Sequence, residues 1–388
     1  MRAPGDVRVR SVATRADRRR FVRMPERVFA DDPAWVAPLG IERLSLIDTE
    51  HNPYFEHAEA CFWIAERDGV PVGRISAQMD GLLEKRAGER IGQFGLFDCI
   101  DDDSVAARLF ETAEDWLRAR ACTRAQGPFN LSTNGECGLL IDGFETPPAL
   151  MMSHARPYYG ALVEGCGYAK VRDLYAYELD LLKGPPERIT RFVEASSRNP
   201  HFRLRPVDMR RYEEELETII DIFNDAWSEN WGFVPLTDAE AQHLAKQIKP
   251  LIDPCGVRIC EYQGEPMAMM VTLFDFNSLI RDLDGRLWPL GWAKLAARLL
   301  SLRLRGRCPP RVRVPLMGVR QRFQTTRQGA AMALMVIESI RLACVEAGAV
   351  WAELSWILED NDGMRNILDQ IGANIYKTYR IYDKALVS

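Results

Sequence analysis

The chain has 388 residues, of which 47% are hydrophobic, and its formal net charge is −5. This length is enough for two domains or one large domain, and the composition is typical of a protein with a substantial core. The acidic balance excludes nucleic-acid binding by the surface as a whole, although positive charge gathers in residues 15–27 and 287–307.

The nine cysteines are scattered, and no two of them form a C-x-x-C pair. An odd number without a repeated spacing favours reduced thiols in a cytoplasm. The five histidines show no spacing typical of a metal site, so we predict no bound metal. We also see no secretory leader and no run of about 18 uncharged apolar residues, and we therefore expect no membrane-spanning helix.

Strands and helices alternate in the first half of the chain. Residues 60–80 predict a hairpin, because a Gly-containing turn separates two runs of strand-forming residues. The elements expected next are a strand at 90–101, a helix at 104–121, a strand at 123–135, and a short helix with a final strand pair at 156–181. A Pro/Gly break at 183–192 is the expected linker.

The second half repeats this order in outline. We predict helices at 212–230 and 236–252, a hairpin at 256–276, a strand at 310–319, a long helix at 328–348, a strand at 349–361, a short helix at 361–372 and a terminal strand at 373–386. The shared order indicates a tandem duplication. We therefore expect a mixed α/β fold with domains at 1–183 and 184–388.

The most informative local pattern lies where the strand at 310–319 leads into the long helix. Gly329 stands in this turn, and Arg320, Arg322 and Arg327 precede it. Free backbone N–H groups and the helix dipole at such an N-terminus suit a phosphate or diphosphate. The residues alone also fit an ordinary loop with solvated arginines, so both interpretations stay open at this point.

The second half resembles the GNAT acyltransferase superfamily, whose members carry acyl-CoA. In that family a Q/R-x-x-G-x-G/A turn binds the CoA diphosphate, and the matching run here is 324–329, with Arg327 at the middle glycine. The family's later N-x-x-A motif matches the run that begins at Asn361, with a methionine in place of the alanine. Leu368 stands where a tyrosine general acid is usual. The resemblance implies a CoA-binding set of Met317, Gly318, Val319, Arg327, Gln328, Gly329, Ala330 and Asn361.

Both halves resemble this superfamily, but the turn near residues 100–104 carries acids and no glycine-rich cradle, so we expect no CoA binding in the first domain. The runs at 130–148, 352–361 and 376–384 are similar to those of bacterial ceramide synthases, a subgroup associated with sphingolipid synthesis. The resemblance implies an acyl-CoA-dependent N-acyltransferase that forms an amide on a long-chain (sphingoid) base. An acyl-carrier protein is an alternative donor. The alternative functions are a soluble acetyltransferase for a small polar amine and a non-catalytic binding module.

Attack of an amine on a thioester needs a base but no nucleophilic side chain, which fits a chain without a visible Ser-His-Asp or Cys-His pattern. Glu353 is the first candidate base, because it stands among apolar residues in a predicted strand. Strand alternation could instead point it outward, and Asp275 is a second candidate. The last strand carries Tyr376, Tyr379 and Tyr382, one of which could donate to the leaving thiolate. Tyr379 is the candidate acid, with packing as the alternative role. His154 is a candidate substrate-binding residue, with a packed histidine as the alternative.

An aromatic and amide-rich segment at 224–237 follows the first helix of the second half. In GNAT-like folds this segment lines the acceptor side, so the resemblance implies that Trp227, Trp231 and Phe233 contact an alkyl chain. Asn230 is the candidate for a catalytic contact with an amine or hydroxyl. A helix cap with a packed tryptophan is the alternative.

Residues 278–310 form an insertion between two strands, which a compact GNAT domain crosses with a short turn. In residues 287–307 a helical projection places tryptophan and leucine opposite lysine and arginine, and there is no acid. This pattern predicts a helix on a membrane surface, and a helix docked on the protein's own core is the alternative. The expected membrane contacts are Trp288, Trp292, Leu295, Leu299, Lys294 and Arg298. We therefore expect a cytoplasmic protein at the inner membrane, with no nucleic-acid partner.

Overall fold

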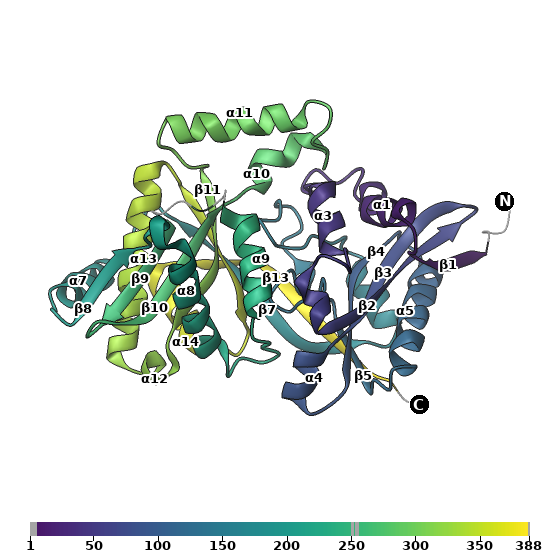
Figure 1. Ribbon diagram of the computed structural model, residues 1–388, viewed down its shortest axis with the longest axis horizontal. Coiled ribbons are helices and arrows are strands. Elements are labelled where there is room, and N and C mark those ends of the chain that lie inside the picture. The colour runs from purple at the N-terminus through teal and green to yellow at the C-terminus, as the bar shows by residue number, and fades with distance from the viewer. Residues whose placement is uncertain (1–5, 250–251, 253–255, 387–388) are drawn as a thin grey trace. The chain divides into compact units, whose positions relative to one another are not determined.

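The computed structural model describes residues 6–249, 252 and 256–386 (Figure 1). The chain forms two compact units, each described here by itself. The first comprises Met1–Leu174, Ile280–Leu287 and Lys377–Ser388, and the second comprises Tyr175–Leu279 and Trp288–Tyr376. The first unit therefore includes the end of the chain and a short piece of the insertion, as well as the first half of the sequence.

The first unit is built on a mostly antiparallel sheet with the strand order β1-β2-β3-β4-β5-β13, and β6 also pairs with β13. Its strands are β1 (Val7–Ser11), β2 (Ala58–Arg67), β3 (Val70–Asp80), β4 (Ile91–Cys99), β5 (Arg124–Gly127), β6 (Leu139–Asp142) and the end of β13 (Asn374–Ala385). Its helices are α1 (Arg15–Arg23), α2 (Pro25–Val28), α3 (Gly40–Leu46), η1 (Pro53–Glu56), α4 (Gly81–Ala87), α5 (Asp103–Arg118) and α6 (Tyr159–Gly165).

Helix α5 packs closely on this sheet because two strand positions carry no side chain. A Cβ atom at Gly73 would lie 2.7 Å from the Leu109 side chain, and one at Gly92 would lie 2.4 Å from Leu117. Both leucines are fully buried. The predicted hairpin, strand and helix at 60–121 are therefore confirmed, and the glycines explain how the helix approaches the sheet.

The second unit has the strand order β7-β12-β11-β10-β9-β8. Its strands are the end of β7 (Ala169–Asp180), β8 (Phe202–Pro206), β9 (Val257–Tyr262), β10 (Glu265–Phe274), β11 (Arg311–Val319), β12 (Trp351–Leu358) and the start of β13. Its helices are α7 (Glu187–Ser197), η2 (Met209–Arg211), α8 (Tyr212–Trp227), α9 (Asp238–Ile248), α11 (Gly291–Leu304), α12 (Gln321–Gln324), α13 (Arg327–Ala347) and α14 (Asp362–Ile371). The short α10 (Asn277–Ile280) ends where the chain passes to the first unit, and η5 (Arg281–Leu283) follows there.

Helices cover both faces of the second sheet (Figure 1). On one face the buried side of α13, including Met332 and Val336, packs on Val312 and Leu354 in a single apolar cluster. On the other face α8 approaches β11 so closely that a Cβ atom at Gly318 would lie 3.0 Å from the Ala226 side chain. The predicted mixed α/β fold is confirmed, with the second unit's order of hairpin, strand, helix, strand, helix and strand as expected.

Three expectations about elements need correction. The break at 183–192 is shorter than predicted, because α7 already begins at Glu187, after Pro186. The segment 156–181 contains one strand, β7, rather than a strand pair. The strand expected at 123–135 ends at Gly127, where the next residue is a proline, which cannot donate to a strand ladder.

No helix in the described part of the chain combines the length and the apolar composition that crossing a membrane requires. The eight cysteines among the described residues are all free, and six of them are buried. Cys255, the remaining cysteine, lies outside the described residues.

Candidate active site

Strands β11 and β12 of the second unit are paired for only part of their length. Their parallel pairing runs from Arg311 and Trp351 to Val314 and Leu354. On the other side of β11, Thr272 of β10 lies opposite both Val314 and Pro315, which marks a β-bulge. Pro315 also has no N–H group to donate to β12. Both strands continue beyond the paired segment, so an opening forms between them.

A cleft of about 520 Å³, part of it open to solvent, occupies this opening. It is lined by the unpaired ends of the two strands, by the end of α8 and by α14. The lining residues are Trp227, Asn230, Val314, Pro315, Met317, Leu354, Ser355, Trp356, Ile357, Leu358, Asn361, Met364 and Leu368. The surface is mainly apolar with a few polar groups, which is the usual make-up of a small-molecule site.

A buried polar network stands directly behind Ser355. The Arg313 Nε donates to Ser355 Oγ at 3.1 Å and lies 3.4 Å from Glu353 Oε1, and its Nη2 donates to the Ser355 carbonyl at 3.3 Å. Ser355 Oγ donates to Glu353 Oε1, and the Tyr376 hydroxyl donates to Glu353 Oε2. Both carboxylate oxygens therefore have hydrogen-bond donors, as a buried charge requires.

Glu353 is fully buried, and Arg313 is 3% exposed. The expectation that alternation could turn Glu353 toward solvent is therefore wrong. Asp275 is also buried, but it lies 3.3 Å from Arg311, at the start of β11, and is not among the residues that line the cleft. Of the two carboxylates considered as a base, Glu353 is the one connected to the cleft, through Ser355.

The predicted tyrosine on the last strand needs a correction. Tyr379 is fully buried in the first unit, where its Cβ lies near Gly138. Tyr376 belongs to the second unit, is partly exposed and contacts Glu353. The two tyrosines are three positions apart and so point to opposite sides of the strand, which explains why the choice between them could not be made from spacing alone.

The acceptor-side residues divide into those that line the cleft and those that do not. Trp227 donates from Nε1 to the Met317 carbonyl at 2.9 Å. It therefore binds the part of β11 that lies beyond the pairing with β12. Its ring meets the Trp356 ring edge to face at 5.5 Å. Asn230 lines the same cleft. The placements of Trp227 and Asn230 therefore agree with the sequence-based expectation.

Trp231, Phe233 and His154 do not line this cleft. Phe233 is buried and packs edge to face on Phe223, so it supports the end of α8. His154 belongs to the first unit, where its Nε2 lies 3.0 Å from Asp32 and its side chain is only 2% exposed. Burial lowers the pKa of His154 below its ordinary value despite the neighbouring carboxylate. The structure thus matches the packed-histidine alternative.

The turn before α13 contains a short helix that the sequence analysis did not predict. Helix α12 occupies it, and Thr326 caps α13 by accepting from the Gly329 N–H at 3.0 Å. A Cβ atom at Gly329 would lie 2.0 Å from the Phe323 carbonyl oxygen. This glycine therefore admits the protein's own backbone, and its expected place in the CoA-binding set stays a prediction.

Of the expected CoA-binding set, Met317 and Asn361 line the cleft, and Asn361 also caps α14 by accepting from the Met364 N–H. The others follow along β11 or begin α13. Arg327 is exposed at the first position of α13, with its guanidinium 5.8 Å from the centre of the Phe192 ring. Arg322 is paired with Glu265.

The corresponding turn of the first unit is capped by an acid. Asp102 accepts from the N–H groups of Ser104 and Val105 at the start of α5, and Arg67 binds its other oxygen at 2.8 Å. A carboxylate of the chain thus accepts from the free N–H groups at this helix start. That the first unit does not bind CoA stays a prediction.

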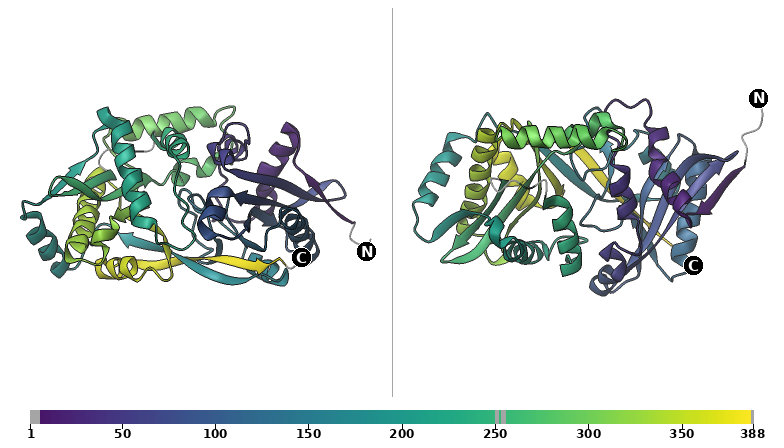
Figure 2. Two further views of the ribbon diagram at one scale, coloured as in Figure 1. Left: turned by 60° about the horizontal axis from the view of Figure 1, so that its bottom comes forward. Right: turned by 45° about the horizontal axis from the view of Figure 1, so that its top comes forward.

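Helix α11, in the predicted insertion, has no buried residue among its 14 residues. It runs along the outside of the second unit (Figure 2). Trp292, Leu300 and Leu304 are exposed, as is the preceding Trp288. These residues share a stripe at i, i+4 spacing, which differs in part from the predicted apolar face.

Three of the residues expected to contact a membrane are placed differently. Leu295 and Leu299 are half-buried rather than exposed. Arg298 donates to the Leu279 carbonyl at 2.6 Å, so its charge is used to hold the helix. Trp288, Trp292 and Lys294 are exposed, and Arg303 and Arg305 are exposed basic residues that the expected set omitted.

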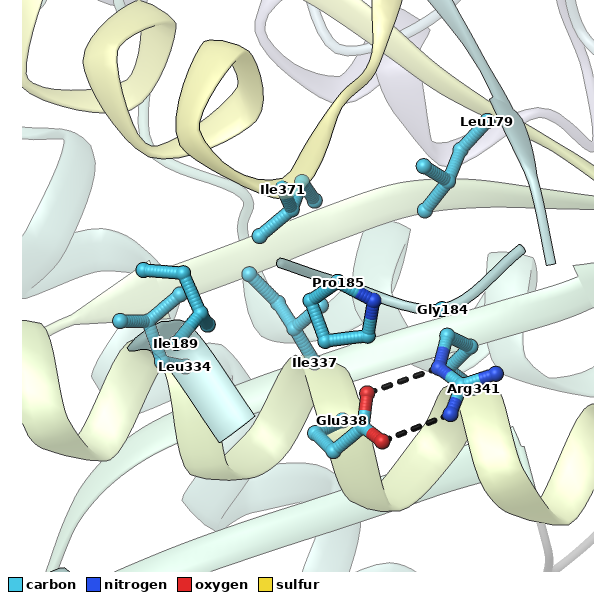
Figure 3. A pocket seen from close by; sticks show the side chains of 9 residues that line it. All are labelled: Leu179, Gly184, Pro185, Ile189, Leu334, Ile337, Glu338, Arg341 and Ile371. Carbon is cyan, nitrogen blue, oxygen red and sulfur yellow. Dashed lines mark hydrogen bonds and ion pairs between the residues drawn. The ribbon is translucent and has the colours of Figure 1, made fainter. Parts of the chain in front are cut away.

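A second, smaller cavity of about 280 Å³ lies between α7, α13 and the end of β7. Leu179, Ile189 and Ile337 form apolar walls, while Glu338 and Arg341 make a two-point ion pair beside Gly184 and Pro185 (Figure 3). Because this ion pair satisfies its own charges and Arg341 also donates to the Leu181 carbonyl, the cavity is best described as a packing gap under α7.

The described residues place Asp48, Glu50 and His51 within metal-binding reach of one another at the surface. Exposed groups of this kind are common without an ion, and the expectation of no metal stays a prediction.

Sequence reasoning missed Arg313, Ser355 and Trp356. Alternation along the strand already puts Glu353 and Ser355 on one face. The partner Arg313 depends on the parallel register of β11 with β12, which no local pattern in the sequence reveals.

Comparison with known proteins agrees with this architecture. By structure, the chain is similar to a tandem GNAT protein from the clavulanic acid biosynthesis pathway, with a TM-score of 0.56 and 11% identity over 99% of each chain. The fold is therefore that of a tandem GNAT protein. No family model matches the chain.

By sequence, a bacterial ceramide synthase from Caulobacter vibrioides (strain NA1000 / CB15N) is 44% identical over 382 residues, which cover 98% of each chain. Protein YghO of Escherichia coli (strain K12) is 40% identical over 381 residues, covering 97% of this chain and 95% of that protein. The chain belongs to the bacterial ceramide synthase family.

Proposed function

We propose that this chain transfers an acyl group from acyl-CoA to the amine of a long-chain sphingoid base and forms an amide of the ceramide type. The observation that carries this proposal is the apolar cleft between the unpaired ends of β11 and β12, with a carboxylate network behind its serine. The name of the Caulobacter relative supports the same activity.

The cleft suits a thioester with a long apolar chain. Trp227, Trp356 and Leu358 offer the apolar surface that alkyl groups bury, and Asn230 offers an amide that can orient an amine or hydroxyl. The Met317 carbonyl is already bound to Trp227, so the cleft wall is held before substrate arrives. Substrate binding then does not have to order this strand, which would otherwise reduce the affinity.

The CoA diphosphate belongs at the start of α13 in this proposal. Arg327 is exposed at the first helical position, and the neutral Thr326 caps the helix without adding negative charge. The helix dipole favours an anion here. Because Gly329 is packed against Phe323, the diphosphate would contact the N-terminal face of α13 beside Arg327 rather than enter a pocket under the glycine.

The chemistry needs a group that removes a proton from the attacking amine. Glu353 is this proton acceptor in our proposal, since its Oε1 is linked to the cleft through Ser355. No covalent acyl-enzyme is required, because the amine attacks the thioester carbon directly.

The test is mass spectrometry of lipids after purified protein is incubated with a long-chain base and acyl-CoAs of varied length. A long-chain amide is the expected product, and a parallel reaction with an acyl-carrier protein thioester identifies the donor. Acetylation of small polar amines alone would favour a soluble acetyltransferase. If CoA binds in calorimetry but no amine is acylated, a binding module is the better description.

We further propose that α11 holds the enzyme at the surface of the inner membrane, where its lipid amine resides. Its exposed Trp292, Leu300 and Leu304, with Trp288 before it, form an apolar stripe. Exposed arginines accompany this stripe, and no acid stands in the helix. An amphipathic helix of this composition binds anionic bilayers by apolar burial and charge attraction.

Liposome flotation with anionic vesicles tests this arrangement. We expect two double variants to float with the vesicles less than the wild type does. Trp288→Ala/Trp292→Ala removes apolar contact with the bilayer, and Arg303→Glu/Arg305→Glu reverses the charge that attracts anionic lipid. Leu342→Ala and Arg188→Glu are matched controls at exposed positions outside α11. Equal flotation of all variants would contradict the proposed membrane contact and leave the acyltransferase proposal standing.

A further inference from the structure

Ser355 is the point at which the buried carboxylate network meets the cleft. Ser355 lines the cleft, whereas Glu353 is fully buried and is not among the lining residues. Of the residues in this network, Ser355 is therefore the one that an amine held in the cleft can approach. Any proton that passes from the amine to Glu353 along this route has to cross Ser355.

The hydrogen bonds at Ser355 have a direction that suits such a transfer. Its hydroxyl proton points to Glu353 Oε1, and the Arg313 Nε donates to the oxygen at 3.1 Å. A hydroxyl oxygen has two lone pairs, so one remains for a donor from the cleft. The serine is thus oriented by the protein with its proton toward the base, and one acceptor position of its hydroxyl is left over.

We infer that Ser355 relays the proton of the attacking amine to Glu353, and this inference rests on the proposed acyltransferase function. The ammonium group of the substrate gives one proton to Ser355 Oγ while the serine proton moves to Glu353 Oε1. The nitrogen lone pair then attacks the thioester carbon. As the C–S bond breaks, the second nitrogen proton neutralises the leaving thiolate, so the products are the amide, free CoA and one proton on Glu353.

Groups from two other strands contact the Glu353 carboxylate. Arg313 of β11 pairs with Oε1, and the Tyr376 hydroxyl of β13 donates to Oε2. Two further charged groups belong to contacts of the neighbouring strands: Glu178 accepts from Trp351, and Arg311 pairs with Asp275. Tyr376 is partly exposed, so one partner of Glu353 lies at the edge of the buried network.

The first experiment compares Ser355→Ala with Ser355→Thr in the full-length protein, with a long-chain base and acyl-CoA as substrates. Loss of the hydroxyl should lower kcat by about 100-fold or more with little change in KM, the range typical of general-base groups. Threonine keeps a hydroxyl and a strand-compatible side chain, so it should restore most of the activity. Circular dichroism and CoA calorimetry confirm that both variants fold and bind the donor.

The pH profile separates a relay from a structural role. Activity of Ser355→Ala should recover as pH rises, because the amine then loses its proton to solvent without help. A merely structural change would lower activity equally at all pH values.

The outcomes distinguish a failure of the acyltransferase function from a failure of the Ser355 relay. If the wild type forms no amide from a long-chain base, the proposed function fails and the relay with it. If the wild type is active and Ser355→Ala retains full activity with an unchanged profile, the relay is wrong while the acyltransferase function stands. Loss of CoA binding by Ser355→Ala would also overturn the relay, because the serine would then act in donor binding.

Discussion

Gly329 offers a direct test of what the turn before α13 is built for. The resemblance to acyl-CoA enzymes assigns this glycine to the cofactor, whereas the structure places it against the Phe323 carbonyl. We predict that Gly329→Ala destabilises the protein even in the absence of any ligand. A Cβ atom here would lie 2.0 Å from the Phe323 oxygen and 2.8 Å from its carbonyl carbon.

The magnitude follows from the bonds that this carbonyl accepts. An ordinary contact begins at 3.4 Å, so the carbonyl or the helix has to move by about 1.4 Å. The Thr326 N–H and hydroxyl donate to this oxygen at 2.9 and 2.8 Å, and such a movement breaks both bonds. Two lost hydrogen bonds cost about 2 kcal/mol, and overpacking adds about 1 kcal/mol or more. Alanine returns up to about 1 kcal/mol as a better helix former.

The expected net loss is therefore about 2 kcal/mol, equivalent to a fall in Tm of about 4–8 °C for a unit of this size. Thermal and urea unfolding of the ligand-free protein measure it. Gly363→Ala in α14 is the matched control, since its nearest neighbour would be Asn361 at 3.9 Å. A Gly329→Ala protein that unfolds like the wild type but no longer binds CoA would refute this reasoning and return the glycine to the ligand.

Three further predictions concern burial, pH and capping. Arg313→Met should cost about 3–5 kcal/mol in urea unfolding because it leaves the Glu353 charge buried without its cation, and Arg313→Met/Glu353→Met should cost less than Arg313→Met alone, which a double-mutant cycle checks. Because burial lowers the pKa of His154 in the folded state, the unfolded chain takes up more protons as the pH drops below about 6.5, so stability decreases as the pH is lowered through this range; His154→Gln should flatten this part of the curve, and an unchanged slope would contradict it. Asn361→Ala removes the N-cap of α14 and should cost about 1 kcal/mol, measured by the shift of the urea midpoint, with Asn361→Asp close to wild type.

Local sequence patterns were enough to predict many of the strands and helices. Period-two runs located the hairpins, and the apolar period of 3.6 located α5 and α13 within a few residues of their ends. The elements that were missed, such as α7 and β8, are short or polar, with much of their surface exposed. Their position depends on packing against α13 and β9, which is decided by contacts distant in sequence.

The candidate site was predictable only where a single element carries the information. Trp227 and Asn230 were found because an aromatic and amide-rich run at a helix end is unusual in itself. The choice between Tyr376 and Tyr379 needed the side of the strand that faces Glu353, and Arg313 needed the parallel register. At Gly329 the motif predicts a contact with CoA, and the structure adds a close approach of the Phe323 carbonyl that no local pattern in the sequence reveals.

The N-cap residues of α5 and α13 differ in charge between the two units. This difference bears on which unit can bind an anionic ligand. At α5 the cap is Asp102, whose carboxylate accepts from backbone N–H groups and from Arg67, so those donors are already used by an anion of the chain itself. At α13 the cap is the neutral Thr326, and an exposed arginine follows it. No cap carboxylate stands at the start of α13, so we expect an external anion to bind there rather than at α5, in the unit that also contains the cleft and Glu353. We accordingly expect one acyl-CoA per chain.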